Sequence, residues 1–126
     1  MTDLAVVPIA RKGFSLEPRI EGSAICLRLS GNADMTVVGP LSAAIKQVHV
    51  EAMRISASEV RCDLHGLFFM NSSCFKAFVT WITSIEALAP EKRYRIRLCS
   101  NPQLHWQKRS LTALRAMAES IVMVET

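Results

Sequence analysis

The 126-residue sequence contains no apolar run that approaches the roughly 18 residues needed to cross a bilayer. Charged residues make up only 21% of it, and glycine and proline number five each. This composition excludes intrinsic disorder, a collagen-like repeat and low-complexity linker for the chain as a whole. The N-terminus is acidic and reaches Pro8 too early for a secretory signal. We therefore expect a cytoplasmic protein that has no membrane partner.

The sequence also lacks the residue patterns of metal centres and of acid–base catalysis. Its four cysteines and three histidines show no metal-ligand spacing. It has neither paired carboxylates suited to acid–base work nor a glycine-rich phosphate loop. Cys26, Cys62 and Cys99 lie inside apolar runs typical of strands, where a free cysteine packs as a small hydrophobic residue. These absences predict that the protein holds no metal and no cofactor.

Aromatic residues are few, with one Tyr and two Trp. Their scarcity bears on whether the positive charge of the chain could bind nucleic acid. The net charge is +4, and the excess lies in residues 61–126, which carry nine Lys or Arg against five Asp or Glu. A basic C-terminal half can meet phosphate, so nucleic-acid binding is one alternative function. A single-strand binder interleaves aromatic residues, however, whereas Arg95 and Arg97 alternate with Ile96 and Leu98. That alternation is typical of a half-exposed strand, and we expect no nucleic-acid partner.

Hydrophobic periodicity divides the chain, after a weakly patterned lead at 1–13, into alternating strands and helices. The predicted strands are 14–19, 24–30, 60–64, 95–99 and 121–124, with a further apolar stretch at 67–70. The predicted helices are 37–55, 71–89 and 101–118. A glycine-containing turn favours a hairpin between the first two strands, and the strand–helix–strand units favour parallel pairing. The pattern predicts a small α/β domain with a mixed sheet.

Two helix starts and two buried helix faces can be assigned from the sequence. Asn71 stands where a side chain caps a first turn, and Asn101 followed by Pro102 is typical of a cap and first helical position. The apolar stripe of the middle helix is Phe75, Phe78, Val79 and Ile82, with Trp81 on its flank. The last helix is expected to bury Leu104, Leu111, Leu114 and Ala118.

The segment from Phe69 to Phe75 carries the most chemical information. It places the hydroxyls of Ser72 and Ser73 in the first turn of a helix, directly after Asn71. Backbone N–H groups are unpaired there and the helix dipole favours negative charge, so a phosphate on either serine would be stabilised. The local residues indicate either a phosphorylation switch or a simple helix cap.

Two motifs of this chain resemble those of the anti-sigma factor antagonists, the small bacterial members of the STAS domain family. The family signature is an apolar strand, Asp-Ser-Ser-Gly and an amphipathic helix, and it is matched here by FMNSSC at 69–74. An upstream element, an apolar strand followed by Gly-x-x-Asp and a helix, is matched by LRLSGNAD at 27–34. With the order of elements, the resemblance covers roughly residues 14–124. It predicts a single STAS-like domain at 14–126, with four to five strands and about three to four helices packed mainly on one face.

The resemblance implies a non-catalytic phosphoprotein that switches partners in signal transduction. Family members bind a serine kinase of the histidine-kinase-like ATPase fold, which doubles as an anti-sigma factor or similar regulator. Phosphorylation of the second serine of the motif breaks that complex, and a serine phosphatase restores it. Carried across, the phosphoacceptor would be Ser73, with Ser72 beside it, and the partner surface would include Asp34, Asn71 and Cys74. A monomer and a homodimer are both compatible with these residues.

Two residues depart from the family pattern. Asn71 replaces the usual aspartate, which keeps the helix cap but removes a carboxylate beside the serines, and Cys74 replaces glycine. Cys74 opens the main alternative, because a thiol in the first turn of a helix can have a lowered pKa. A redox sensor, or a thiol enzyme that pairs Cys74 with His65 or His49, would use it. The opposing expectation is that Cys74 is a small buried residue.

Overall fold

The first three strands form an antiparallel meander. In the computed structural model, which describes residues 4–126, they are β1 (Ile9–Arg11), β2 (Phe14–Glu21) and β3 (Ala24–Ala33). The predicted hairpin between β2 and β3 is confirmed, and its turn consists of Gly22 and Ser23. Gly22 has a φ of +62°, a left-handed conformation that glycine adopts without steric penalty.

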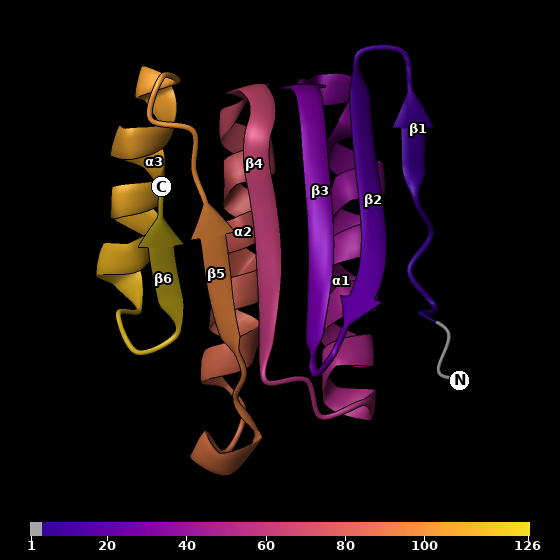
Figure 1. The fold of residues 1–126 in the computed structure, drawn as a ribbon, viewed down its shortest axis with the longest axis vertical. Helices are drawn as coiled ribbons and strands as arrows, with labels where there is room; N and C mark the ends of the chain where they lie inside the picture. The colour runs from indigo at the N-terminus through magenta and orange to yellow at the C-terminus, as the bar shows by residue number, and fades with distance from the viewer. Residues whose placement is uncertain (1–3) are drawn as a thin grey trace.

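The remaining strands run parallel to β3 and alternate with helices (Figure 1). The strands are β4 (Glu59–Met70), β5 (Arg95–Cys99) and β6 (Val122–Glu125). The helices are α1 (Val38–Arg54), α2 (Ser72–Glu86) and α3 (His105–Met117), with short 3₁₀ helices η1 (Met35–Val37) and η2 (Pro90–Lys92). The strand order in the sheet is the order in the sequence, β1 to β6. The predicted α/β domain with a mixed sheet is therefore confirmed.

The six strands exceed the four to five that the sequence predicts. The additional strand, β1, comes from the lead segment at 1–13, of which residues 1–3 lie outside the described residues. Three residues are too few to show an alternating pattern, and β1 forms because its backbone pairs with β2. Val6 and Ile9 in this segment are buried in the common core.

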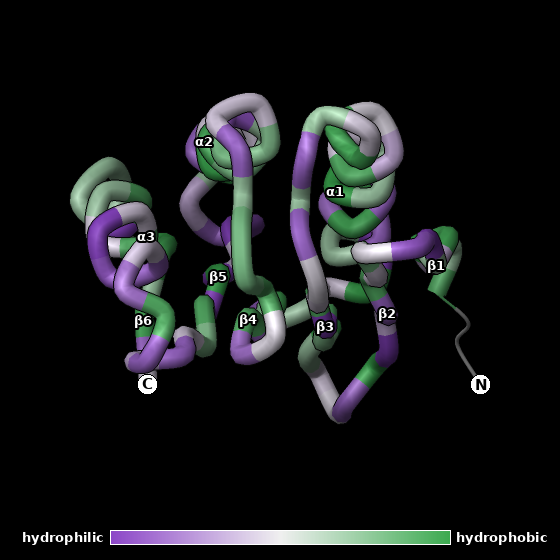
Figure 2. The backbone as a smooth tube through the Cα atoms, turned by 90° about the horizontal axis from the view of Figure 1, so that it is seen from above, coloured by the Kyte–Doolittle hydropathy of each residue, from purple (hydrophilic) through white to green (hydrophobic). Residues whose placement is uncertain are grey.

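All three α-helices lie on one side of the sheet, as the view from above in Figure 2 shows. Alternate strand residues point to that side and form the core, among them Val60, Cys62 and Leu64 of β4. The residues between them face the opposite, open side of the sheet. The observed arrangement agrees with the expected packing of helices mainly on one face.

The buried face of α2 is rotated from the predicted stripe. Its buried residues are Cys74, Phe78, Trp81, Ile82 and Ile85, whereas Phe75 and Val79 are only partly buried. Trp81 is 2% exposed because its indole Nε1 donates to the Tyr94 hydroxyl at 2.7 Å. That hydroxyl also lies 2.6 Å from His49 Nδ1, which links α1, α2 and the segment before β5. A polar partner far along the chain therefore places the indole inside.

The predicted start of α3 at Asn101 and Pro102 is wrong. The helix begins at His105, and its N-cap residue Leu104 makes no side-chain cap and is only half-buried. Asn101 instead closes a local turn, in which its Oδ1 accepts from the Gln103 N–H at 2.9 Å. The expected burial of Leu111, Leu114 and Ala118 is confirmed.

Strand β4 contains two register shifts relative to β3. Between Arg28 and Ser30, and again between Gly31 and Asn32, β4 contains one residue more than β3 does. Its pairing with β5 ends at Asp63, so the last part of β4 has no strand on that side. Three side-chain hydrogen bonds from the β5–α3 region satisfy the free carbonyls instead. They are Gln107 Nε2 to Leu64 O at 2.6 Å and to Leu67 O at 3.0 Å, and Asn101 Nδ2 to His65 O at 3.0 Å.

Candidate functional site

Asn71 caps α2 as the sequence predicts. Its backbone is extended, with φ −77° and ψ 170°, and its Oδ1 accepts from the Cys74 N–H at 2.8 Å. Its own carbonyl accepts the first helical bond, from the Phe75 N–H at 3.0 Å. The cap thus satisfies one of the four unpaired N–H groups of the first turn. An amide oxygen does this as well as the family's carboxylate oxygen.

Ser72 and Ser73 occupy the first two positions of α2. Ser72 is exposed and Ser73 is half-buried. Within the described residues 4–126, neither hydroxyl has a hydrogen-bond partner, so neither is needed to hold the fold. The chain therefore presents two uncommitted hydroxyls beside the positive end of a helix dipole.

Asp34 lies beside the start of α2, although it is almost forty residues away in the sequence. The Asn71 N–H donates to Ala33 O at 2.9 Å, and the Cys74 thiol donates to Asp34 O at 3.7 Å. The Asp34 carboxylate is exposed and accepts from the Thr36 hydroxyl at 2.6 Å and the Thr36 N–H at 2.9 Å, which lower its pKa. The structure thus brings the two sequence motifs together at one end of the sheet.

Gly31 explains the glycine of the upstream motif. Its φ is +94°, and a Cβ at this position would lie 2.0 Å from Gly13 O. The neighbouring Asn32 N–H donates to that same carbonyl at 2.7 Å. The turn between β1 and β2 therefore packs against β3 only because residue 31 has no side chain.

Cys74 is fully buried, with 0% of its surface exposed. Burial raises the pKa of its thiol, and the nearby Asp34 carboxylate raises it further. A protonated, inaccessible thiol is a poor nucleophile. The expectation that Cys74 is a small buried residue is confirmed, and this geometry opposes the redox and thiol-enzyme alternatives.

The two histidines considered as partners of Cys74 are bonded elsewhere. His49 Nδ1 lies 2.6 Å from the Tyr94 hydroxyl, and desolvation lowers the pKa of this imidazole. His65 Nδ1 lies 2.8 Å from Asp63 Oδ1 on the open side of the sheet. Neither arrangement activates a thiol.

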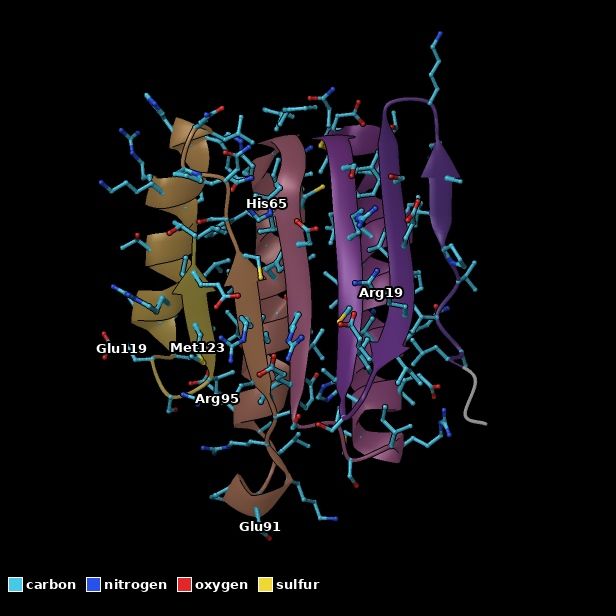
Figure 3. The ribbon with its side chains drawn as sticks, in the orientation of Figure 1. Arg19, His65, Glu91, Arg95, Glu119 and Met123 are labelled. Atoms are coloured by element: carbon cyan, nitrogen blue, oxygen red, sulfur yellow. The ribbon has the colours of Figure 1, made fainter. Side chains whose placement is uncertain are left out.

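Part of the positive charge in the C-terminal half has a structural role. Arg97 is 27% exposed and pairs with Glu59 at 3.1 Å and Glu125 at 2.9 Å. Arg93 donates to the carbonyls of Leu88 at 3.1 Å and Glu86 at 2.9 Å, where α2 ends. Arg95 lies at the start of β5, at the opposite end of the sheet from the first turn of α2 (Figure 3). Two arginines of the basic run, Arg93 and Arg97, thus have partners within the chain.

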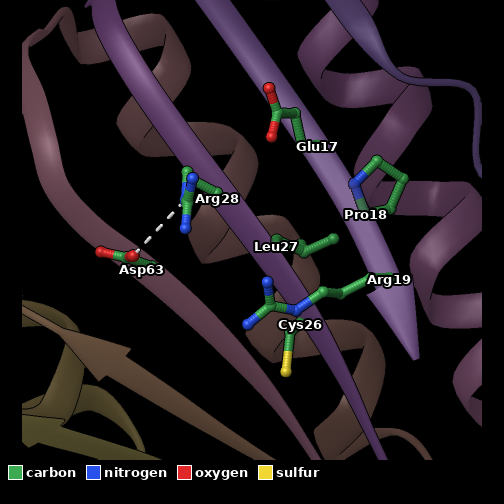
Figure 4. A pocket seen from close by; sticks show the side chains of 7 residues that line it. All are labelled: Glu17, Pro18, Arg19, Cys26, Leu27, Arg28 and Asp63. Carbon is green, nitrogen blue, oxygen red and sulfur yellow. Dashed lines mark ion pairs between the residues drawn. The ribbon is translucent and has the colours of Figure 1, made fainter. Parts of the chain in front are cut away.

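A shallow pocket of about 200 Å³ lies on the open side of the sheet (Figure 4). It is lined by Glu17, Pro18, Arg19, Cys26, Leu27, Arg28 and Asp63. The Arg28 guanidinium lies 3.8 Å from the Asp63 carboxylate, and Arg19 pairs with Glu21 at 2.8 Å. The guanidinium groups are thus paired with carboxylates of the chain, and the pocket does not indicate a charged ligand.

Between residues 4 and 126, no three His, Cys, Asp or Glu side chains are grouped so that they could hold a metal ion. In the same range, no helix is both long and apolar enough to span a membrane.

The burial of one residue near the site and the exposure of another cannot be predicted from the sequence. Gln107 is 0% exposed and connects α3 to β4, but a glutamine in a polar helix segment gives no sign of burial. Phe68 is exposed although it stands in an apolar run, because it lies at the second register shift of β4. Hydrogen bonds to β4 explain the burial of Gln107, and the register between β3 and β4 explains the exposure of Phe68.

No family model and no curated protein matches the sequence, but solved structures match the fold. An anti-sigma factor antagonist from Mycobacterium paratuberculosis is 18% identical, with a TM-score of 0.66 over 90% of this chain and 88% of that chain. The anti-sigma factor antagonist SpoIIAA in its unphosphorylated form is 22% identical, with a TM-score of 0.57 over 90% and 87% of the two chains. The Bacillus cell fate determinant SpoIIAA in its phosphorylated form is 24% identical, with a TM-score of 0.57 over 90% and 91%. The chain therefore has the STAS fold of the anti-sigma factor antagonists.

Proposed function

We propose that this chain is a non-catalytic cytoplasmic regulator that binds a serine kinase of the histidine-kinase-like ATPase fold. The kinase phosphorylates Ser73, the phosphate breaks the complex, and a serine phosphatase resets it. The binding surface includes Asp34, Asn71 and Ser72. Cys74, which the motif also predicts there, is 0% exposed and lies beneath that surface.

One observation carries this proposal: the two motifs that resemble the family's meet at one end of the sheet. The bonds from the Asn71 N–H to Ala33 O and from the Cys74 thiol to Asp34 O fix that meeting. The serine hydroxyls beside it are free for transfer, and SpoIIAA, which shares the fold, has been solved in a phosphorylated form. A dianion added there would repel acidic groups of a partner and would be costly to desolvate in an interface.

Phosphorylation is tested with purified kinase from the same genome, ATP and mass spectrometry of the intact protein and its peptides. We expect one phosphate, on Ser73, in the wild type and in Ser72→Ala, and none in Ser73→Ala. Modification confined to residues outside Asn71–Cys74 would contradict the assignment.

Control of binding is tested by calorimetry with the same kinase. Ser73→Ala should bind like the wild type, and Ser73→Asp should lose at least about tenfold in affinity, because a buried interfacial charge without a partner is strongly unfavourable. Thr112→Asp on the exposed side of α3 is the matched control for an added carboxylate and should bind normally. Equal affinities for Ser73→Ala and Ser73→Asp would argue against a phosphorylation switch.

A further inference from the structure

Three large hydrophobic side chains are exposed at the end of the sheet where α2 begins. They are Met35, 69% exposed, Phe68, 60% exposed, and Phe69, 48% exposed, and we refer to them as the apolar rim. Met35 begins η1 and is separated from β3 only by Asp34, and the last residues of β3 and β4 are paired at Ala33 and Met70. The apolar rim therefore borders the start of α2 from two adjacent strand ends.

The exposure of two consecutive phenylalanines results from the irregular end of β4. In regular pairing, successive residues point to opposite sides, and one of the two would reach the core side. Here Leu67 pairs with Gly31 and Phe69 with Asn32, so Phe68 is the extra residue of a bulge. Bulges of this kind re-aim side chains and occur next to functional sites.

The chain holds this bulged segment in place. Gln107 is fully buried and donates to the carbonyls of Leu64 and Leu67, which precede Phe68 in β4. Asn101 donates to the carbonyl of His65 between them. The Leu67 carbonyl is bonded to Gln107 just before Phe68, and Phe69 and Met70 pair with β3 just after it. The bulge at Phe68 is therefore part of the fold and not a frayed strand end.

Basic side chains lie on the segments that adjoin the apolar rim. The Arg11 guanidinium donates to Thr36 O at 2.8 Å, next to Met35, and Lys12 follows it in the turn whose Gly13 carbonyl binds β3. Lys76 is exposed and lies one helical turn beyond Ser72, on the same face of α2. The exposed Asp34 carboxylate lies at the same border.

We propose that the apolar rim is the main contact area for the kinase partner, and that it inserts into an apolar recess whose margin carries acidic side chains. The proposal rests on the function proposed above and adds the chemistry of the partner's surface. Exposed aromatic residues at the centre of an interface contribute most of its affinity, and a basic border favours an acidic counterpart and accelerates encounter. A phosphate on the neighbouring serine would then face those acidic side chains.

The test measures kinase affinity by calorimetry for Phe68→Ser and for Val50→Ser, a control on α1 where the wild-type side chain is 62% exposed. We expect Phe68→Ser to bind at least about tenfold more weakly and Val50→Ser to bind like the wild type. Met35→Ser, which leaves β4 intact, should also weaken binding. Lys12→Glu should slow association at low salt, and the effect should shrink at high salt.

The outcomes separate this proposal from the one on which it rests. If the wild type does not bind the kinase at all, the proposed function fails and this inference with it. If the wild type binds and both Phe68→Ser and Met35→Ser bind equally well, only the apolar rim is excluded. If sedimentation shows a wild-type dimer that Phe68→Ser dissociates, the surface joins two copies of this chain and the proposal is wrong.

Discussion

At the scale of single residues, the amide of Asn71 replaces the carboxylate of the family motif as helix cap but leaves one buried polar atom without a partner among the described residues. Its Oδ1 caps α2, but its Nδ2 is buried and has no hydrogen-bond partner among the described residues. An aspartate would present an acceptor instead of that unpaired donor and would place a negative charge at the helix N-terminus. The cap is therefore retained at some expense of stability.

This gives a prediction for urea unfolding. Asn71→Ala should lower the free energy of unfolding by about 1 kcal/mol, because the Cys74 N–H loses its acceptor. Asn71→Asp should be at least as stable as the wild type, because it keeps the cap and removes the unpaired donor. An alanine variant of wild-type stability would show that the cap contributes nothing.

Local rules made some of these residues predictable and left others out of reach. Asn71, Ser72 and Ser73 could be placed from the sequence because a helix start depends on a few neighbouring residues. The burial of Gln107 and the exposure of Phe68 could not be predicted. The first depends on hydrogen bonds from α3 to β4, and the second on the register between β3 and β4. The burial of the Trp81 indole could not be decided from the sequence for a similar reason, since its partner Tyr94 lies outside α2, just before β5.

At the scale of elements, the turn between β1 and β2 and the end of β3 depend on each other. Gly31 leaves room for Gly13 O because it has no Cβ. The same Gly13 carbonyl binds the Asn32 N–H, two residues before Asp34. The glycine of the upstream motif therefore shapes the site through its backbone and the absence of a side chain.

We expect Gly31→Ala to be destabilising by more than about 1 kcal/mol, because a left-handed φ and a steric overlap coincide there. Gly39→Ala is the matched control. Gly39 lies in α1, where a Cβ meets no atom within 4 Å, and alanine should stabilise the helix by roughly 0.5–1 kcal/mol. Thermal unfolding of both variants checks the contrast. Equal effects at the two positions would show that the packing at Gly31 is unimportant.

At the scale of the whole molecule, the order of elements was predictable because each helix and most strands are long enough to show a period. The strand β1 was not, since three residues show none. The start of α3 differs from the predicted one because Asn101 does not cap a helix. Its side chain donates to the His65 carbonyl of β4 and accepts from the Gln103 N–H in its own turn.

The fold also makes a prediction about the four free cysteines. Cys62 and Cys74 are each 0% exposed, and Cys26 and Cys99 are half-buried on the open side of the sheet. Burial raises the pKa of all four thiols, to about 11 for Cys99. Near neutral pH, a thiol reagent should therefore modify the native protein slowly and the unfolded protein at all four positions. Rapid labelling of Cys74 in the native state, located by mass spectrometry, would revive the redox alternative.

The two outer strands of the sheet are its shortest, with three residues in β1 and four in β6. These two strands offer few free backbone groups to an extended peptide or to another sheet. Residues 17–21 of β2 extend beyond β1, but Pro18 has no backbone N–H there and charged side chains flank it. Partners that bind by strand addition, and the stacking of chains into fibrils, are therefore both disfavoured. Under the proposed function, recognition falls to side chains at the end of the sheet, where a phosphate on Ser73 would change it.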